Sequence, residues 1–436
     1  MNTLAKYTLP ALALLSLGLG SCQPEFHSPK FEAGSADFTR YIAVGNSLTA
    51  GFSDGGLYRE GQVNSYPNIL ARQFRLVGGG AFEQPLFSET QFNGSGYLRL
   101  TGFSATGTPV TANVTNNLAI RATTPTTLYT RFDTRVDNLG VPGIRLSDIH
   151  TAGYGSQAGN PYFERITPTT TPLQSYFQRV KAEAATATFF SNWLGNNDVL
   201  GYATTGGLGG VITRTDTFAL KNSRIINALT ANGAKGIVAT IPDVTNVPFF
   251  TTVRVADVRA RFKAANANLD VYIQVTGSSG NTTRLATDAD LITLQGSAVI
   301  GTTTTGNPFP VGAGLSAAQS NPIPNQFVLD ATEQANVQAA TTAFNSAIVA
   351  KANEKGLAIF DSNTFFRSVA QSGFVTNGVN NTAGFVSGNL FSLDGVHPTP
   401  RGYAVVANEM IRAINAKYGS TLPLTNPNDY RGVLIP

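Results

Sequence analysis

Three side chains near the two ends of the sequence have the chemistry of a nucleophile, a base and an acid. Ser47 lies near the start, and Asp394 and His397 lie three residues apart near the end. A serine hydroxyl is a poor nucleophile at neutral pH, so it needs an adjacent base, usually a histidine whose other ring nitrogen faces a carboxylate. The spacing lets Asp394 reach the Nδ1 hydrogen of His397, which leaves Nε2 for Ser47. These three residues predict acyl transfer by an activated serine.

Four short segments carry these residues together with turn-forming glycines and amides. They are Gly45-Asn46-Ser47-Leu48, Gly140-Val141-Pro142-Gly143, Gly195-Asn196-Asn197-Asp198 and Asp394-Gly395-Val396-His397. The first three follow apolar, β-branched stretches that predict strands, and the fourth lies on the last loop. Open α/β sheets bind ligands outside the carboxyl ends of their strands. We therefore expect the four segments to meet at one edge of a sheet.

The elements that position these segments alternate in type along the chain. Units in which a strand is followed by a helix are typical of a parallel sheet. The expected strands are 38–44, 136–139, 187–194, 236–241 and 357–360, and the expected helices are 66–74, part of 173–184, 217–231, 331–354 and 401–418.

Two stretches rich in Gly and Thr interrupt this alternation, at about 77–135 and 245–328. The first alternates apolar residues without a helical period, which predicts short strands and loops. We interpret both as large insertions in one domain at 37–436. The second contains Phe249 and Phe250, which either line an acyl channel or attach the insertion to the body of the domain.

The four segments, in this order, resemble the signature blocks of the SGNH subgroup of GDSL hydrolases, from about residue 38 to residue 418. The resemblance implies a three-layer α/β/α, flavodoxin-like fold with a central parallel sheet, and no metal or cofactor. It also implies an oxyanion hole made by the backbone N–H groups of Ser47 and Gly143 and the side-chain amide of Asn197. The sequence departs from the family at Asn46, where the family name implies aspartate, and in the size of its insertions.

The amino terminus has the pattern of an export signal. Residues 1–21 contain Lys6, an apolar stretch from Leu9 to Leu19 and small residues before Cys22. The stretch is shorter than the roughly 20 residues of a membrane span. The run Leu19-Gly20-Ser21-Cys22 resembles a bacterial lipobox, which implies acylation of Cys22 after signal removal, followed by a polar tether at 22–36. An ordinary secreted protein with an incidental cysteine is the alternative.

Composition excludes several other classes of site. A single cysteine forbids an internal disulfide, and three histidines with one cysteine cannot build a zinc site unless carboxylates join them. We expect His27, in the tether, and His150, beside a loop, to be incidental. The 30 Lys and Arg against 26 Asp and Glu form no basic stripe, so nucleic acid is not an expected partner.

The sequence therefore predicts a serine esterase or lipase that hydrolyses carboxylic (acyl) esters through an acyl-enzyme. Its expected partners are an acyl ester and, through the lipid anchor, a membrane of the bacterial cell envelope, at the outer membrane or cell surface. Two alternatives remain open. One is a carbohydrate or peptidoglycan O-acetylesterase, which the same segments serve. The other is a non-catalytic surface binding lipoprotein on the same scaffold.

Overall fold

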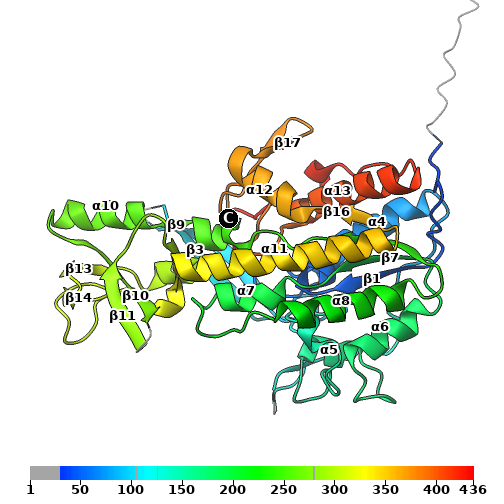
Figure 1. Ribbon diagram of the computed structural model, residues 1–436, viewed down its shortest axis with the longest axis horizontal. Helices are drawn as coiled ribbons and strands as arrows, with labels where there is room; N and C mark the ends of the chain where they lie inside the picture. Colours follow the sequence, from blue (N-terminus) through cyan, green and yellow to red (C-terminus); the bar gives the residue numbers. More distant parts are fainter. Residues whose placement is uncertain (1–29, 105–106, 125, 278–279) are drawn as a thin grey trace, which may run out of the picture. The chain divides into compact units, whose positions relative to one another are not determined.

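A five-stranded sheet forms the centre of the computed structural model (Figure 1). Its strands are β1 (Tyr41–Gly45), β6 (Asn138–Gly140), β7 (Phe189–Trp193), β8 (Lys235–Ala239) and β16 (Ala358–Phe360). Their order across the sheet is β16-β8-β7-β1-β6, and every neighbouring pair is parallel. In chain order this is the 2-1-3-4-5 arrangement of flavodoxin-like sheets. The predicted α/β fold with a central parallel sheet is confirmed.

The structure describes residues 30–104, 107–124, 126–277 and 280–436. Within them, Glu32–Pro436 is one compact unit. The predicted signal peptide, Cys22 and most of the predicted tether lie outside the described residues. None of the helices in the described ranges is long and apolar enough to cross a membrane.

Helices cover both faces of the sheet because its strands are apolar on both sides. All residues of β1 are buried, and they alternate between two cores: Ile42 and Val44 pack into one, and Tyr41 and Ala43 into the other. Two helices, α4 (Tyr66–Arg75) and α13 (Pro400–Tyr418), close the second core. The first core is closed by α6 (Tyr176–Ala184), α8 (Thr215–Leu229) and α11 (Ala331–Glu354). The predicted three layers are therefore present (Figure 1).

The five predicted helices correspond to α4, α6, α8, α11 and α13 to within a few residues at each end. The first predicted strand begins later than expected, because Phe38 stacks on Phe74 at 4.1 Å between ring centres instead of entering the sheet. The pattern did not predict α3 (Arg59–Val63), α5 (Pro161–Ile166), α7 (Asn197–Ala203), α9 (Pro248–Thr251), α10 (Val255–Ala265) and α12 (Ser362–Ser372).

The first insertion consists of two antiparallel hairpins, as its alternating pattern predicts. One pairs β2 (Tyr97–Phe103) with β3 (Pro109–Val114), and the other pairs β4 (Ile120–Ala122) with β5 (Leu128–Tyr129). A buried arginine of α5, Arg165, attaches the insertion to the body. Its guanidinium donates hydrogen bonds of 2.6 and 2.8 Å to two carbonyl oxygens of the insertion and lies 4.3 Å from the centre of the Phe87 ring.

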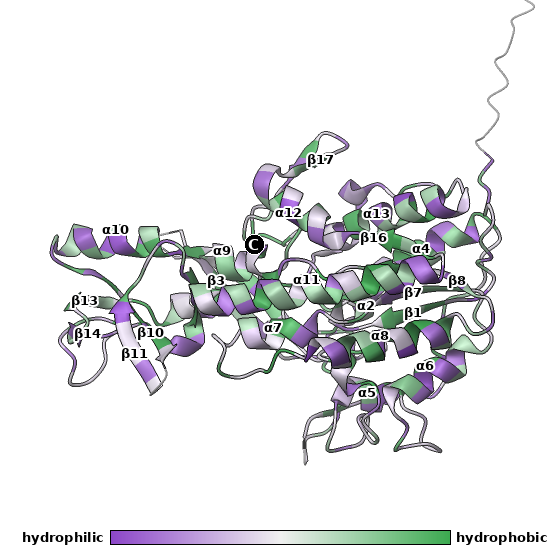
Figure 2. Ribbon diagram, viewed as in Figure 1, coloured by the Kyte–Doolittle hydropathy of each residue, from purple (hydrophilic) through white to green (hydrophobic). Residues whose placement is uncertain are grey.

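The second insertion has a hydrophobic core of its own. Its sheet has the order β11-β10-β13-β14, made of β10 (Asp270–Gly277), β11 (Gly280–Leu285), β13 (Ala313–Ser316) and β14 (Gln319–Ser320). The helix α10 carries both apolar and polar residues (Figure 2), and it buries Val255, Val258 and Phe262, spaced three and four residues apart, against this sheet. The insertion is therefore a small α+β subdomain rather than a loop.

The two phenylalanines at the start of this insertion attach it to the body. Phe249 and Phe250 lie in α9, are 5% and 1% exposed, and pack edge to face with ring centres 5.0 Å apart in the core of the main domain. The N–H of Phe249 also donates to the carbonyl of Gly395. Of the two alternatives from the sequence, the structure favours attachment.

We predict that Phe250→Ala lowers the free energy of unfolding by about 3–5 kcal/mol, because it removes a fully buried ring and leaves a cavity. Urea unfolding measures the change. The control is Phe103→Ala on β2, whose side chain is 49% exposed; it should change stability by less than about 0.5 kcal/mol. Equal losses in the two variants would contradict the packing described.

Candidate active site

Ser47 lies where β1 passes into a short helix, α2 (Ser47–Ala50). The preceding Gly45 has no room for a side chain, since a Cβ there would lie 1.9 Å from Oγ1 of Thr49. Asn46 is buried, and its Oδ1 accepts the N–H of Leu48 at 3.1 Å, so it caps α2. The neutral amide therefore performs a local structural role at the position where the family name implies aspartate.

The structure brings Ser47, His397 and Asp394 into one chain of hydrogen bonds. Nε2 of His397 lies 2.8 Å from Oγ of Ser47, and Nδ1 lies 2.8 Å from Oδ2 of Asp394. The ring of Phe52 packs against the imidazole, with ring centres 4.7 Å apart. This is the connectivity that a serine nucleophile, a general base and an orienting carboxylate require.

Asp394 is held in its ionised form by the loop that carries it. Its Oδ1 accepts the backbone N–H groups of Val396 and His397, both at 2.8 Å, and Oδ2 accepts the N–H of Gly55 at 2.9 Å. Burial raises the pKa of this carboxyl. The charge of His397, the hydrogen bond from its ring and those from the backbone N–H groups of His397 and Val396 outweigh burial and hold the pKa at about 2. The carboxylate can therefore orient His397 and stabilise its protonated form.

The three candidate oxyanion donors come from strands on both sides of the nucleophile. Gly143 follows β6 and Asn197 begins α7, directly after β7, and β1 lies between these two strands. The backbone N–H groups of Ser47 and Gly143 have no acceptor among the described residues. Gly143 has φ of 82°, which favours glycine. One N–H of the Asn197 amide donates to the carbonyl of Ile144 at 2.9 Å, and the other remains for a ligand.

Two side chains to which we gave no role in the sequence hold these loops together. The buried carboxylate of Asp198 accepts the N–H groups of Leu146 and Ser147, at 2.6 and 3.1 Å, so it joins the loop after β7 to the loop after β6. The hydroxyl of Tyr176 donates to the carbonyl of Leu139 at 2.7 Å and accepts the N–H of Gly45 at 3.1 Å. Only Asp198 had a sequence signal, because it ends the Gly195–Asp198 segment.

The one other histidine among the described residues, His150, takes no part in this arrangement. His27 lies outside the described residues. The ring of His150 stacks on Phe177 at 4.5 Å, and burial lowers its pKa. Among the described residues, no group of three or more His, Cys, Asp or Glu side chains is arranged to hold a metal ion.

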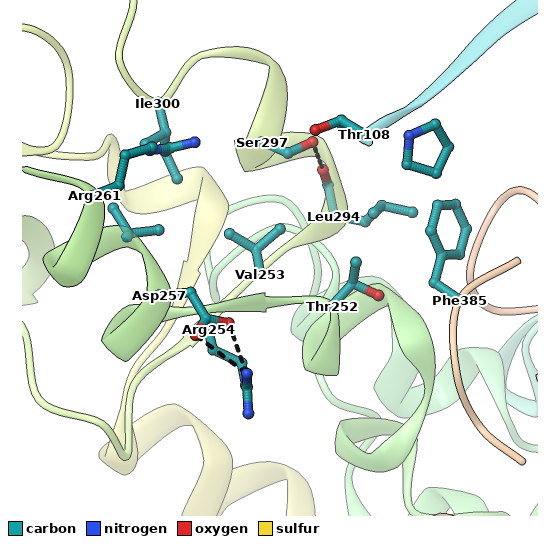
Figure 3. A pocket seen from close by; sticks show the side chains of 12 residues that line it. Thr108, Thr252, Val253, Arg254, Asp257, Arg261, Leu294, Ser297, Ile300 and Phe385 are labelled. Atoms are coloured by element: carbon teal, nitrogen blue, oxygen red, sulfur yellow. Dashed lines mark hydrogen bonds and ion pairs between the residues drawn. The ribbon is translucent and has the colours of Figure 1, made fainter. Parts of the chain in front are cut away.

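A cavity of about 300 Å³ lies between the two insertions (Figure 3). Leu294, Val253 and Phe385 form apolar parts of its wall, and Arg261 and Ile300 lie at the end opposite Phe385. Leu294 also reaches the loop of the triad, since a Cβ at Gly395 would lie 3.1 Å from its Cδ2. The cavity therefore borders the loop that carries the base at Leu294, but none of Ser47, Asp394 and His397 lines it.

Known proteins resemble this chain over most of its length. The model of the GDSL-like lipase/acylhydrolase family matches residues 41–410. The search of curated proteins finds no match. Among solved structures, an α/β hydrolase from the metagenome of Lake Arreo, Spain, is 11% identical with a TM-score of 0.36, over 87% of this chain and 96% of that one. An extracellular lipase from Streptomyces rimosus is 14% identical with a TM-score of 0.32, over 86% and 99% of the two chains.

We predict that the wild type loses more stability on acidification than Asp394→Asn does. The folded-state pKa of Asp394, about 2, lies below its unfolded value of 3.8. The unfolded chain therefore binds more protons between these values, and the stability that ionised Asp394 contributes above about pH 4 is lost as the pH falls toward 2. Urea unfolding at about pH 6 and about pH 3 measures the difference. Equal losses in both proteins would refute the low pKa.

Proposed function

Because the chain belongs to the GDSL-like lipase/acylhydrolase family and is a hydrolase of esters, we propose that it works through Ser47, His397 and Asp394. The observation that carries this proposal is the hydrogen-bond chain from Oγ of Ser47 through the imidazole to the Asp394 carboxylate, with 2.8 Å at both steps.

In the proposed first half-reaction, Oγ of Ser47 attacks the ester carbonyl carbon while Nε2 of His397 takes the hydroxyl proton. Asp394 keeps its negative charge and stabilises the imidazolium. The tetrahedral intermediate collapses when the C–O bond to the alcohol breaks, and His397 gives the proton to the departing alkoxide. This leaves an acyl-enzyme on Ser47.

In the second half-reaction, His397 takes a proton from water, whose oxygen attacks the acyl-enzyme. Collapse of this intermediate releases the carboxylic acid and returns the proton to Ser47. In both halves, the N–H groups of Ser47 and Gly143 and the free amide N–H of Asn197 would stabilise the oxyanion. Each such donor is typically worth about 10²–10³ in kcat.

We propose acyl chains longer than acetyl as the substrate class. The cavity between the insertions supports this proposal, because its volume of about 300 Å³ is in the range of small-molecule sites. Leu294 connects its apolar wall with Gly395 of the loop that carries the base. Rates on p-nitrophenyl esters from acetate to palmitate, measured beside acetylated xylan, separate this class from acetylesterase activity, which would favour the acetylated substrates.

We further propose that the enzyme works outside the cytoplasm, anchored to the bacterial envelope by acyl chains on Cys22. The lipobox-like run Leu19–Cys22 supports this proposal. A single short lipid chain gives only reversible membrane binding, so stable anchoring would require more than one acyl chain. The hydrolase unit would then meet its substrates at or near the membrane surface.

We predict that Ser47→Ala lowers kcat by about 10⁴-fold or more, because the hydroxyl is the attacking group and the loss of one member of a catalytic unit removes most of the rate that the whole unit provides. Hydrolysis of p-nitrophenyl butyrate measures the loss, and a fluorophosphonate probe should label the wild type but not the variant. The matched control is Ser346→Ala, an exposed serine of α11, which should keep both rate and labelling. A correctly folded Ser47→Ala with wild-type turnover would refute the mechanism.

We predict that Cys22→Ser moves the protein from the membrane fraction to the soluble fraction, because serine cannot form the thioether that carries the lipid. Fractionation of expressing cells followed by immunoblotting measures the change. Ser47→Ala is the control, since it should stay with the membranes. A Cys22→Ser protein that remains there would show that another element holds it.

A further inference from the structure

A tight turn directly after the nucleophile helix lies against the loop that carries the acid and the base. In this clamp turn, Ser53–Gly56, the N–H groups of the two end residues each donate to the other's carbonyl at 2.9 Å. Its second residue, Asp54, has φ of 54°, a left-handed conformation that is unfavourable for residues with a side chain. Such a conformation persists only when the surrounding structure holds it in place.

Four hydrogen bonds join the clamp turn to the acid loop, residues 392–398. Three of them are donated by the turn: Ser53 Oγ donates to the Pro398 carbonyl at 2.9 Å, the Asp54 N–H donates to Ser392 Oγ at 2.8 Å, and the Gly55 N–H donates to Asp394 Oδ2 at 2.9 Å. The fourth is donated by the loop, from the Leu393 N–H to Asp54 Oδ1 at 3.0 Å. Ser392 also links Asp54 to Asp394, because its hydroxyl accepts the Asp54 N–H and donates to Oδ1 of Asp394 at 3.2 Å. The turn therefore contacts both oxygens of the proposed catalytic carboxylate, one directly and one through Ser392.

The Asp54 side chain is a second carboxylate beside this site, and it is only 4% exposed. Its Oδ2 accepts the hydroxyl of Tyr58 at 2.7 Å. Burial raises the pKa of Asp54, while hydrogen bonds from Leu393 and Tyr58 and the charge of Arg431 oppose that effect. A buried carboxylate with these donors is a fixed acceptor for the backbone of the acid loop.

Arg431 supplies the charge that balances Asp54, and it comes from the segment after α13. One guanidinium nitrogen lies 3.8 Å from Oδ2 of Asp54 and donates to the Tyr58 hydroxyl at 3.0 Å. The same guanidinium holds Glu60 with two bonds of 2.7 and 2.8 Å. The carbonyl of Arg431 accepts the N–H of Arg401, which anchors the segment to the first turn of α13.

We propose that Asp54 is a positioning residue of the reaction, which fixes the Asp394 carboxylate through the backbone of the acid loop. Arg431 keeps this second carboxylate in place. The inference rests on the proposed function, because it assigns Asp54 to the same site. Displacing a catalytic group by about 1 Å can cost about 10²-fold in rate, so a residue that never touches the substrate can limit turnover.

The test compares kcat and KM of the full chain for p-nitrophenyl butyrate, with active sites counted by fluorophosphonate titration. Asp54→Ala should lower kcat per titrated site by about 10- to 100-fold, with little change in KM, because it leaves the Leu393 N–H without its acceptor. Asp54→Asn keeps an acceptor for that N–H and should recover part of the rate. A kcat per site at the wild-type level in Asp54→Ala would overturn the proposal.

A matched control separates positioning from a general loss of stability. Asp290, in the second insertion, is 3% exposed and is likewise held by a backbone N–H, a hydroxyl and an arginine. Asp290→Asn should lower the unfolding midpoint but leave kcat per site unchanged, and an equal fall in its kcat would overturn the proposal. If Asp54→Ala does not fold, kcat per site is measured for Asp54→Asn and Arg431→Gln instead. A reduced kcat supports the positioning role of Asp54, and wild-type kcat in both variants refutes it.

The same experiment distinguishes failure of the inference from failure of the proposed function. Ser47→Ala is measured beside the other variants. If it keeps wild-type turnover, the proposed mechanism is wrong and the Asp54 assignment falls with it. If Ser47→Ala is inactive while the Asp54 variants are fully active per site, only the positioning role is wrong.

Discussion

The hydrogen bond between Oγ of Ser47 and Nε2 of His397 joins residues 350 positions apart, and the rest of the site is arranged around it. One partner is fixed by β1, which lies between β6 and β7 where the strand order of the sheet reverses. The other lies on the acid loop just before α13. The loops after β6 and β7, which carry Gly143 and Asn197, flank the bond because their strands are the two neighbours of β1.

Both insertions contact segments that hold the acid loop in place. The second contacts the acid loop through Phe249, whose N–H donates to Gly395, and through Leu294. The first contributes Tyr97, which stacks on Tyr58 with ring centres 4.0 Å apart, and Tyr58 holds Asp54. The insertions are therefore attached to the loops that position the proposed triad.

The sequence predicted what depends on local pattern and on spacing within one segment. The parallel sheet followed from apolar strands that are each followed by a helix, and the pairing of Asp394 with His397 from their separation of three residues. The contacts of Asp54 and Arg431 had no such signal, because an aspartate in a turn and an arginine far along the chain are ordinary surface residues until the fold joins them. The small core around Phe262 was missed for a related reason: its strands are mostly short and its Gly- and Thr-rich composition is typical of loops.

The distance along the chain between Ser47 and its base has a consequence for the growing polypeptide. The portion synthesised first contains β1 and the nucleophile, but neither the imidazole nor the loop that Asp54 clamps. Bringing such distant residues together has a larger loop-closure entropy cost than forming local contacts. Under the proposed mechanism, a nascent or truncated chain would therefore carry Ser47 without its base, and ester hydrolysis would begin only when the whole hydrolase unit has folded.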